Sequence, residues 1–97
     1  MLEKRIENRL KILVTKAGGK AVKFVSPGNA GVNDRLILLP GKRMFMVELK
    51  APGKKRSPLQ EKWARDMESL DFTVYCLDTI EAVDQFIWEF VKERQWE

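Results

Sequence analysis

The alternation of hydrophobic and polar positions predicts an α/β chain with seven elements, in the order helix, three strands, helix, strand, helix. Apolar residues at three- and four-residue spacing predict an amphipathic helix over residues 2–17. A second helix is expected from the N-cap Ser57 to about residue 70, and a third from Asp78 or Thr79 to about Arg94. The strands are expected over residues 20–25, 35–39, 44–50 and 72–77.

The apolar stripes of the last two helices predict which of their residues enter the core. These are Leu59, Trp63, Met67 and Leu70 in the second helix and Ile80, Val83, Ile87, Phe90 and Val91 in the third.

A β-hairpin is predicted where residues 40–43 separate two strand-forming segments. If the turn is centred on the middle two of these four residues, antiparallel pairing sets Arg35 opposite Glu48. Asp34, one place before Arg35, can then lean toward Glu48 at the end of the strand. Lys50 faces the same way as Glu48, because side chains alternate along a strand.

Two neighbouring carboxylates and a lysine favour phosphodiester cleavage. Carboxylates that are forced together repel, and Mg²⁺ relieves this by binding oxygens of both while it also offsets phosphate charge. An ammonium on the same face can stabilise negative charge that develops in the transition state. The alternative is a solvated strand, since Glu-x-Lys is common on exposed strands. Two features favour the site over this alternative. A glycine-containing segment, residues 28–33, leads to Asp34, and three cations follow Pro52-Gly53.

Size and composition indicate one domain over residues 1–97 of ordinary soluble type. No apolar run reaches the roughly 20 residues of a membrane span, and the N-terminus lacks the apolar core of a signal peptide, so we expect a cytoplasmic protein. Histidine is absent, which excludes histidine catalysis. The single cysteine, Cys76, stands in an apolar run and is expected to be buried.

Charge is distributed unevenly along the chain. Residues 1–60 hold 14 Lys and Arg against 4 Asp and Glu, whereas residues 61–97 hold 4 against 10. The basic part carries the candidate site, which favours a polyanion such as DNA as the partner, although any single lysine is more often simply solvated. The candidate nucleic-acid-binding residues are Lys23, Arg35, Lys42, Arg43, Lys54, Lys55 and Arg56.

Five motifs at this spacing resemble the VRR-NUC domain, a branch of the PD-(D/E)xK nuclease superfamily. They are Glu3-Lys4-Arg5-Ile6, Gly18-Gly19 with Lys23-Phe24, residues 31–35 (Gly-Val-Asn-Asp-Arg), residues 47–53 (Val-Glu-Leu-Lys-Ala-Pro-Gly) and Ser57-Pro58-Leu59-Gln60. The resemblance implies a restriction-endonuclease-like α-β-β-β-α-β core, here with an additional C-terminal helix. It also implies an Mg²⁺- or Mn²⁺-dependent DNA endonuclease that acts on branched DNA such as four-way junctions, as in small phage or bacterial members.

The resemblance also implies roles for individual residues. Asp34 and Glu48 match the metal ligands, with assistance from the Leu49 carbonyl, and Lys50 matches the catalytic lysine. Gln60 matches a further catalytic glutamine, but it equally completes a capping box that begins three residues earlier.

The first predicted helix offers two candidates for a further metal ligand. Glu3 matches the first-helix glutamate of the family, and Glu7, one turn away, could take its place. Asn33 stands where the superfamily has proline, which shapes the approach to the aspartate and ligates nothing.

Trp88 falls off the inward stripe of the last helix and Trp96 lies near the terminus, which suggests a homodimer surface. Two hypotheses compete with the nuclease: a basic nucleic-acid-binding module without chemistry, and an interaction protein that pairs through its acidic C-terminal part.

Overall fold

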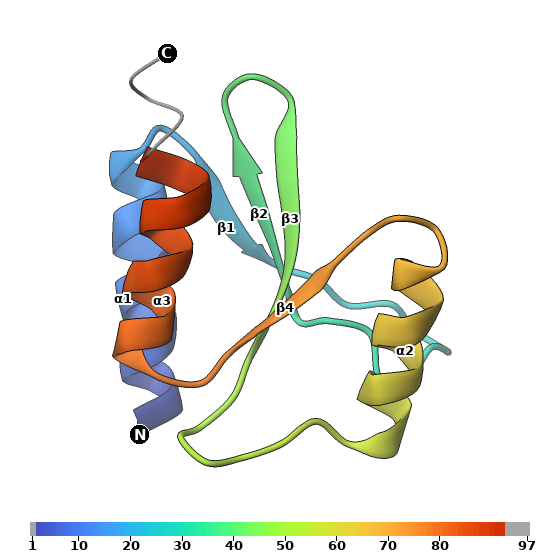
Figure 1. Ribbon diagram of the computed structural model, residues 1–97. Coiled ribbons are helices and arrows are strands. Elements are labelled where there is room, and N and C mark those ends of the chain that lie inside the picture. Colours follow the sequence, from blue (N-terminus) through green and yellow to red (C-terminus); the bar gives the residue numbers. More distant parts are fainter. Residues whose placement is uncertain (1, 93–97) are drawn as a thin grey trace.

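A computed structural model describes residues 2–92 and shows a four-stranded sheet with helices on both sides (Figure 1). The elements are α1 (Leu2–Lys16), β1 (Lys20–Lys23), β2 (Arg35–Leu39), β3 (Arg43–Leu49), α2 (Pro58–Glu68), β4 (Val74–Leu77), α3 (Ile80–Phe86) and the π-helical turn η1 (Ile87–Lys92). The predicted order and α/β class are confirmed. The predicted end of the last helix at Arg94 lies outside the described residues.

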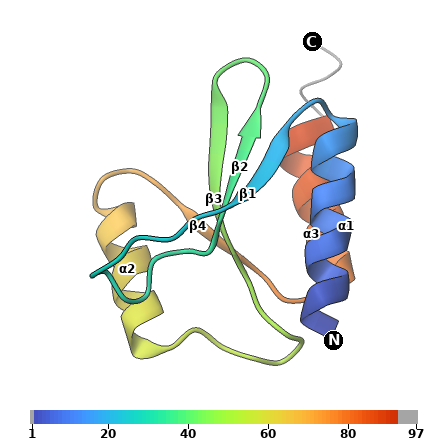
Figure 2. The same ribbon diagram turned by 180° about the vertical axis from the view of Figure 1, so that it is seen from behind.

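The strands lie in the order β1-β2-β3-β4, with antiparallel pairs β1–β2 and β2–β3 and a parallel pair β3–β4. The helices α1 and α3 lie side by side along one side of the sheet, and α2 stands apart on the other (Figures 1 and 2). The parallel pairing of β4 requires the chain to cross over from β3, and α2 lies on that crossover.

The hairpin forms as predicted, but its register differs from the prediction by one residue. Leu39 pairs with Arg43 and Arg35 pairs with Val47, so Arg35 does not lie opposite Glu48. The physical reason is a three-residue loop in which Gly41 and Lys42 both adopt positive φ, 84° and 62°.

The main core lies between the sheet and the α1–α3 pair. It contains Ile6, Leu10, Val14, Ile37, Leu39, Val47, Leu49, Leu77, Val83, Phe86, Ile87 and Val91. On α2 the predicted stripe is wrong at both ends: Leu59 is 53% exposed and Leu70 is 61% exposed. The reason is that α2 covers only the end of the sheet near β4, where it buries Ala64.

Within residues 2–92, no helix combines the length and the apolar character that crossing a bilayer requires.

Candidate active site

The end of β3 and the residue before β2 bring Asp34 and Glu48 to the same level of the sheet. Continuing the observed register by one residue beyond the Arg35–Val47 pair places Asp34 opposite Glu48. The carboxylate of Asp34 is fixed there, because its Oδ1 accepts a hydrogen bond of 3.1 Å from the backbone N–H of Leu49. The one-residue difference in register therefore sets the two acids directly across from each other.

Glu48 is a buried carboxylate with one satisfied and one unsatisfied oxygen. Its exposed fraction is 1%. Oε1 accepts a hydrogen bond of 3.0 Å from Nε of Arg56, whose other nitrogen donates to the carbonyl of Val74 at 2.6 Å. Oε2 has no hydrogen-bond partner among the described residues. An unpaired buried carboxylate oxygen is costly, and a cation is the natural partner for it.

Burial and neighbouring negative charges disfavour the charged form of both acids. Burial raises the pKa of Glu48, Arg56 lowers it, and Asp34 adds to the rise. Burial also raises the pKa of Asp34, the Leu49 N–H lowers it, and Glu3 raises it further. The pair is therefore poised to take up either protons or a cation.

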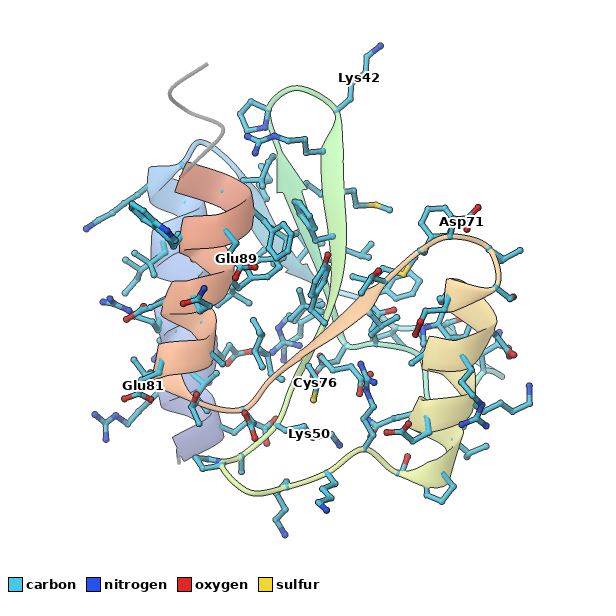
Figure 3. The ribbon with its side chains drawn as sticks, viewed as in Figure 1. Lys42, Lys50, Asp71, Cys76, Glu81 and Glu89 are labelled. Atoms are coloured by element: carbon cyan, nitrogen blue, oxygen red, sulfur yellow. The ribbon has the colours of Figure 1, made fainter. Side chains whose placement is uncertain are left out.

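Lys50 follows directly after β3 and lies close to both carboxylates. Its backbone N–H donates to the Leu77 carbonyl at 3.0 Å, which holds the chain beside β4. Its ammonium lowers the pKa of Asp34 and of Glu48. Figure 3 shows it on the side of the sheet where Cys76 projects from β4.

The prediction that Cys76 is buried is wrong. Its side chain is exposed, because it lies across from Glu48 on the face of β4 that α1 and α3 do not cover. Side chains alternate along β4, so Leu77 points into the main core, whereas Val74 is buried although it lies on the same face as Cys76.

Asn33 is a positioning residue that the sequence did not reveal. It is fully buried, its Nδ2 donates to the Arg35 carbonyl at 2.8 Å, and its Oδ1 accepts from Nε1 of Trp63 at 3.0 Å. These two bonds tie the residues on either side of Asp34 to α2. An Asn directly before the acid was a visible signal, but its partner thirty residues away was not.

Gly31 allows this loop to approach α2 closely. Its φ is +88°, and a Cβ at this position would lie 2.4 Å from the carbonyl oxygen of Leu59. Only glycine fits both the conformation and the contact.

The two first-helix glutamates have different surroundings. Glu7 is ion-paired to Arg35 and lies 3.9 Å from Lys4, so it is engaged within the protein. Glu3 is exposed and near enough to Asp34 to raise the pKa of that carboxyl.

Gln60 lies at the start of α2, where its Oε1 accepts from the backbone N–H of Ser57 at 2.8 Å and its own N–H donates to the Ser57 hydroxyl at 3.2 Å. This is the capping box, the second of the two roles expected for Gln60.

The predicted nucleic-acid-binding cations fall into two groups. The guanidinium groups of Arg35, Arg43 and Arg56 bond to protein groups: Arg35 to Glu7 and the Asp34 carbonyl, Arg43 to the Pro40 and Phe90 carbonyls, and Arg56 as described above. Lys23, Lys42, Lys54 and Lys55 are exposed.

Lys42 and Arg43, two of these candidates, do not lie near the carboxylates. They lie at the tip of the hairpin, at the end of β3 opposite to Lys50 (Figure 3). The seven residues from Arg43 to Lys50 correspond to roughly 23 Å of strand.

The donor set fits a hard divalent cation. Among residues 2–92, no three His, Cys, Asp or Glu side chains gather closely enough to hold a metal ion by themselves. Two carboxylates, one of them with a free buried oxygen, suit Mg²⁺, which typically binds through one or two carboxylates and keeps waters and substrate phosphates as its other ligands.

Comparison with known proteins gives two similarities. The chain matches no family model. It is 46% identical over 77 residues to "Putative nuclease p44" of Acyrthosiphon pisum secondary endosymbiont phage 1, which covers 79% of this chain and 83% of the phage protein. A solved VRR-NUC domain superposes with a TM-score of 0.85 at 24% identity, over 93% of this chain and 98% of that one. The phage relative shows that the chain belongs to the family of that phage protein, and the solved domain shows that it has the VRR-NUC fold.

Proposed function

We propose that this protein is an Mg²⁺- or Mn²⁺-dependent endonuclease that hydrolyses phosphodiester bonds of DNA, with a preference for branched structures such as four-way junctions. The name of the phage relative and the family fold support a nuclease. The basic balance of residues 1–60 supports a nucleic-acid substrate.

One observation carries the proposal: Glu48 is almost completely buried, yet its Oε2 has no partner within residues 2–92, and Asp34 lies across from it. In a purely structural role, both oxygens of a buried carboxylate would normally have a hydrogen-bond partner. A free oxygen beside a second acid is instead the arrangement that a cation site requires.

Each residue of the site has a defined task in this proposal. Asp34, the Oε2 of Glu48 and the Leu49 carbonyl hold the cation, and Glu3 adds charge to the same region. A divalent cation there supplies Lewis-acid activation of water and neutralises phosphate charge. The Lys50 ammonium stabilises charge on the phosphate as it is attacked.

Gln60 has a less direct task. Its Oε1 is used by the capping box, so it acts on the site by fixing the start of α2, and only its amide nitrogen remains for substrate.

A homodimer would supply the two opposed sites that symmetric cutting of a four-way junction needs. Trp88, 63% exposed, supports a partner surface, and Trp96 lies outside the described residues. Sedimentation that gives a monomer at micromolar concentration would remove the dimer and leave the chemistry unchanged.

The test is cleavage of a labelled four-way junction, a flap and a plain duplex, each with Mg²⁺, Mn²⁺ or EDTA. We expect cleavage only with metal, and most on the junction. Lys50→Gln should abolish it, whereas Lys42→Gln, at the far end of β3, should cut like wild type. Cleavage that persists in EDTA, or no cleavage with either metal, would refute the proposal.

A further inference from the structure

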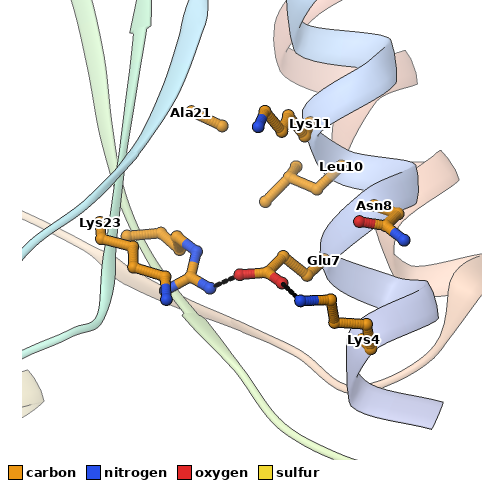
Figure 4. A pocket seen from close by; sticks show the side chains of 8 residues that line it. Lys4, Glu7, Asn8, Leu10, Lys11, Ala21 and Lys23 are labelled. Carbon is orange, nitrogen blue, oxygen red and sulfur yellow. Dashed lines mark hydrogen bonds and ion pairs between the residues drawn. The ribbon is translucent and has the colours of Figure 1, made fainter. Parts of the chain in front are cut away.

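A hollow of about 250 Å³ lies between α1 and β1, outside the carboxylate site (Figure 4). Lys4, Asn8 and Lys11 line it from the helix, and Ala21 and Lys23 from the strand. A second hollow of about 320 Å³, lined by Glu3, Lys4 and Lys23 among others, shares several of these residues. We refer to the two together as the α1–β1 groove.

The sequence of α1 explains why one wall of the groove is basic. The helix buries Ile6, Leu10 and Val14 against the sheet. Lys4 and Lys11 are seven residues apart, so they stand on one face, two turns from each other, next to this buried stripe. The groove is therefore bordered by cations along about 10 Å of helix, from seven residues at about 1.5 Å each.

Two acidic residues, Glu3 and Glu7, line the groove, but they are outnumbered by its four cations, Lys4, Lys11, Lys23 and Arg35. Glu7 forms its close ion pair with Arg35, and Lys4 approaches it only to 3.9 Å (Figure 4). Within residues 2–92, Lys11 and Lys23 have no ion-pair partner. Lysine ammonium groups left unpaired around a hollow attract anions.

The groove leads to the carboxylate site. Arg35 lines both hollows, and its guanidinium donates to the backbone carbonyl of Asp34 at 2.9 Å. Glu3, which lines the second hollow, lies near enough to Asp34 to affect the pKa of its carboxyl. An extended polyanion seated in the groove would thus reach the two acids at one end.

We propose that the α1–β1 groove binds successive phosphates of the DNA strand that leads into the site, with Lys4, Lys11 and Lys23 as the contacts. This inference rests on the proposed function. The 10 Å between Lys4 and Lys11 corresponds to about three nucleotides of one strand, at about 3.4 Å each along the axis of a duplex. Leu10 and Ala21 line the groove and no aromatic side chain does, so it contacts the backbone and stacks no base.

The test is the salt dependence of binding of a labelled duplex in EDTA, so that no cleavage occurs. Lys11→Gln and Lys23→Gln should each reduce the slope of log K against log salt by about 0.9, the value for one lost phosphate contact. Lys16→Gln, on the same helix but outside the groove, should leave the slope unchanged. All three lysines are exposed, and thermal melts of the variants check that the fold is kept.

The same variants separate binding from chemistry. With Mn²⁺, Lys11→Gln and Lys23→Gln should raise KM and leave kcat at its wild-type value. If the salt slopes of both variants equal the slope of Lys16→Gln, the groove does not bind DNA phosphates, even if the wild-type protein cleaves DNA. If the wild-type protein binds the DNA duplex but never cleaves it, the proposed function fails. The salt slopes of the variants still show whether the groove binds phosphates. Wild-type protein that binds no DNA would overturn the inference.

Discussion

Arg56 holds one oxygen of Glu48, and the other oxygen has no partner in the part of the chain that the structure describes. The sequence predicted Arg56 as a DNA-binding cation, but its guanidinium is largely buried and bonds to Glu48 and to the Val74 carbonyl. A buried carboxylate needs such a counter-charge to remain ionised. The ion pair thus keeps Glu48 charged and oriented while Oε2 stays available.

Arg56→Gln should weaken Mn²⁺ binding by about 10- to 100-fold, the usual cost of removing a residue that supports a metal ligand. Without the guanidinium, the pKa of Glu48 rises further and the carboxyl takes up a proton in place of a cation. Calorimetric titration of the metal-free protein with Mn²⁺ measures this. Lys55→Gln, the exposed neighbour, is the control. An Arg56→Gln protein with wild-type Mn²⁺ affinity would contradict the role.

Asp34→Asn should reduce cleavage more than about 100-fold, beyond the effect of a supporting residue, because it removes a ligand itself. It should not lower the melting temperature of the metal-free protein at neutral pH. The amide oxygen can still accept from the Leu49 N–H, and the charge that is lost belongs to a half-buried carboxylate, 3.6 Å from Arg35, whose charged form desolvation disfavours. A clear drop in melting temperature would mean that the carboxylate is held by contacts other than those described.

The raised pKa values of Asp34 and Glu48 predict a dependence of stability on pH. A carboxyl whose pKa is higher in the folded than in the unfolded state stabilises the fold at low pH. The ordinary carboxyl pKa is near 4, and the pKa in the folded state is higher. The extra stability is therefore lost as the pH rises from about 4 through the folded-state pKa. Mn²⁺ binding displaces the protons, so the rise in melting temperature that Mn²⁺ causes should grow over the same window. A metal effect that stays constant down to pH 4 would contradict this.

Trp63→Phe should destabilise the protein by about 1–3 kcal/mol, because it leaves the buried Oδ1 of Asn33 without its donor. For a chain of this size each kcal/mol lowers the melting temperature by about 4–8 °C. Cleavage should fall as well, since Asn33 fixes the residues around Asp34. Trp88→Phe is the matched control, because Trp88 is 63% exposed. Equal effects of the two substitutions would remove the positioning role.

Local signals predicted the elements of the fold well. Ser57, Pro58 and Gln60 marked the start of α2, and the turn residues around Gly41 marked the hairpin. The register was missed because it depends on whether the loop has two residues or three, and Lys42, which has a positive φ, belongs to the loop in either case. Lysine gives no sequence signal for that conformation.

Contacts between distant segments could not be predicted from the sequence. Nothing in the spacing of Arg56 and Glu48 distinguishes a buried ion pair from two solvated charges, and the Asn33–Trp63 bond spans thirty residues. Such pairs depend on how α2 and its flanking loops close over one end of the sheet. The exposure of Cys76 has the same origin, because it follows from which face the helices cover.

The most direct test of a shared cation site is anomalous diffraction from crystals grown with Mn²⁺. We expect one or two Mn²⁺ peaks, with at least one in contact with carboxylate oxygens of both Asp34 and Glu48, and with Oε2 as the oxygen used by Glu48. Fully occupied Mn²⁺ elsewhere with no peak between these two acids would contradict it.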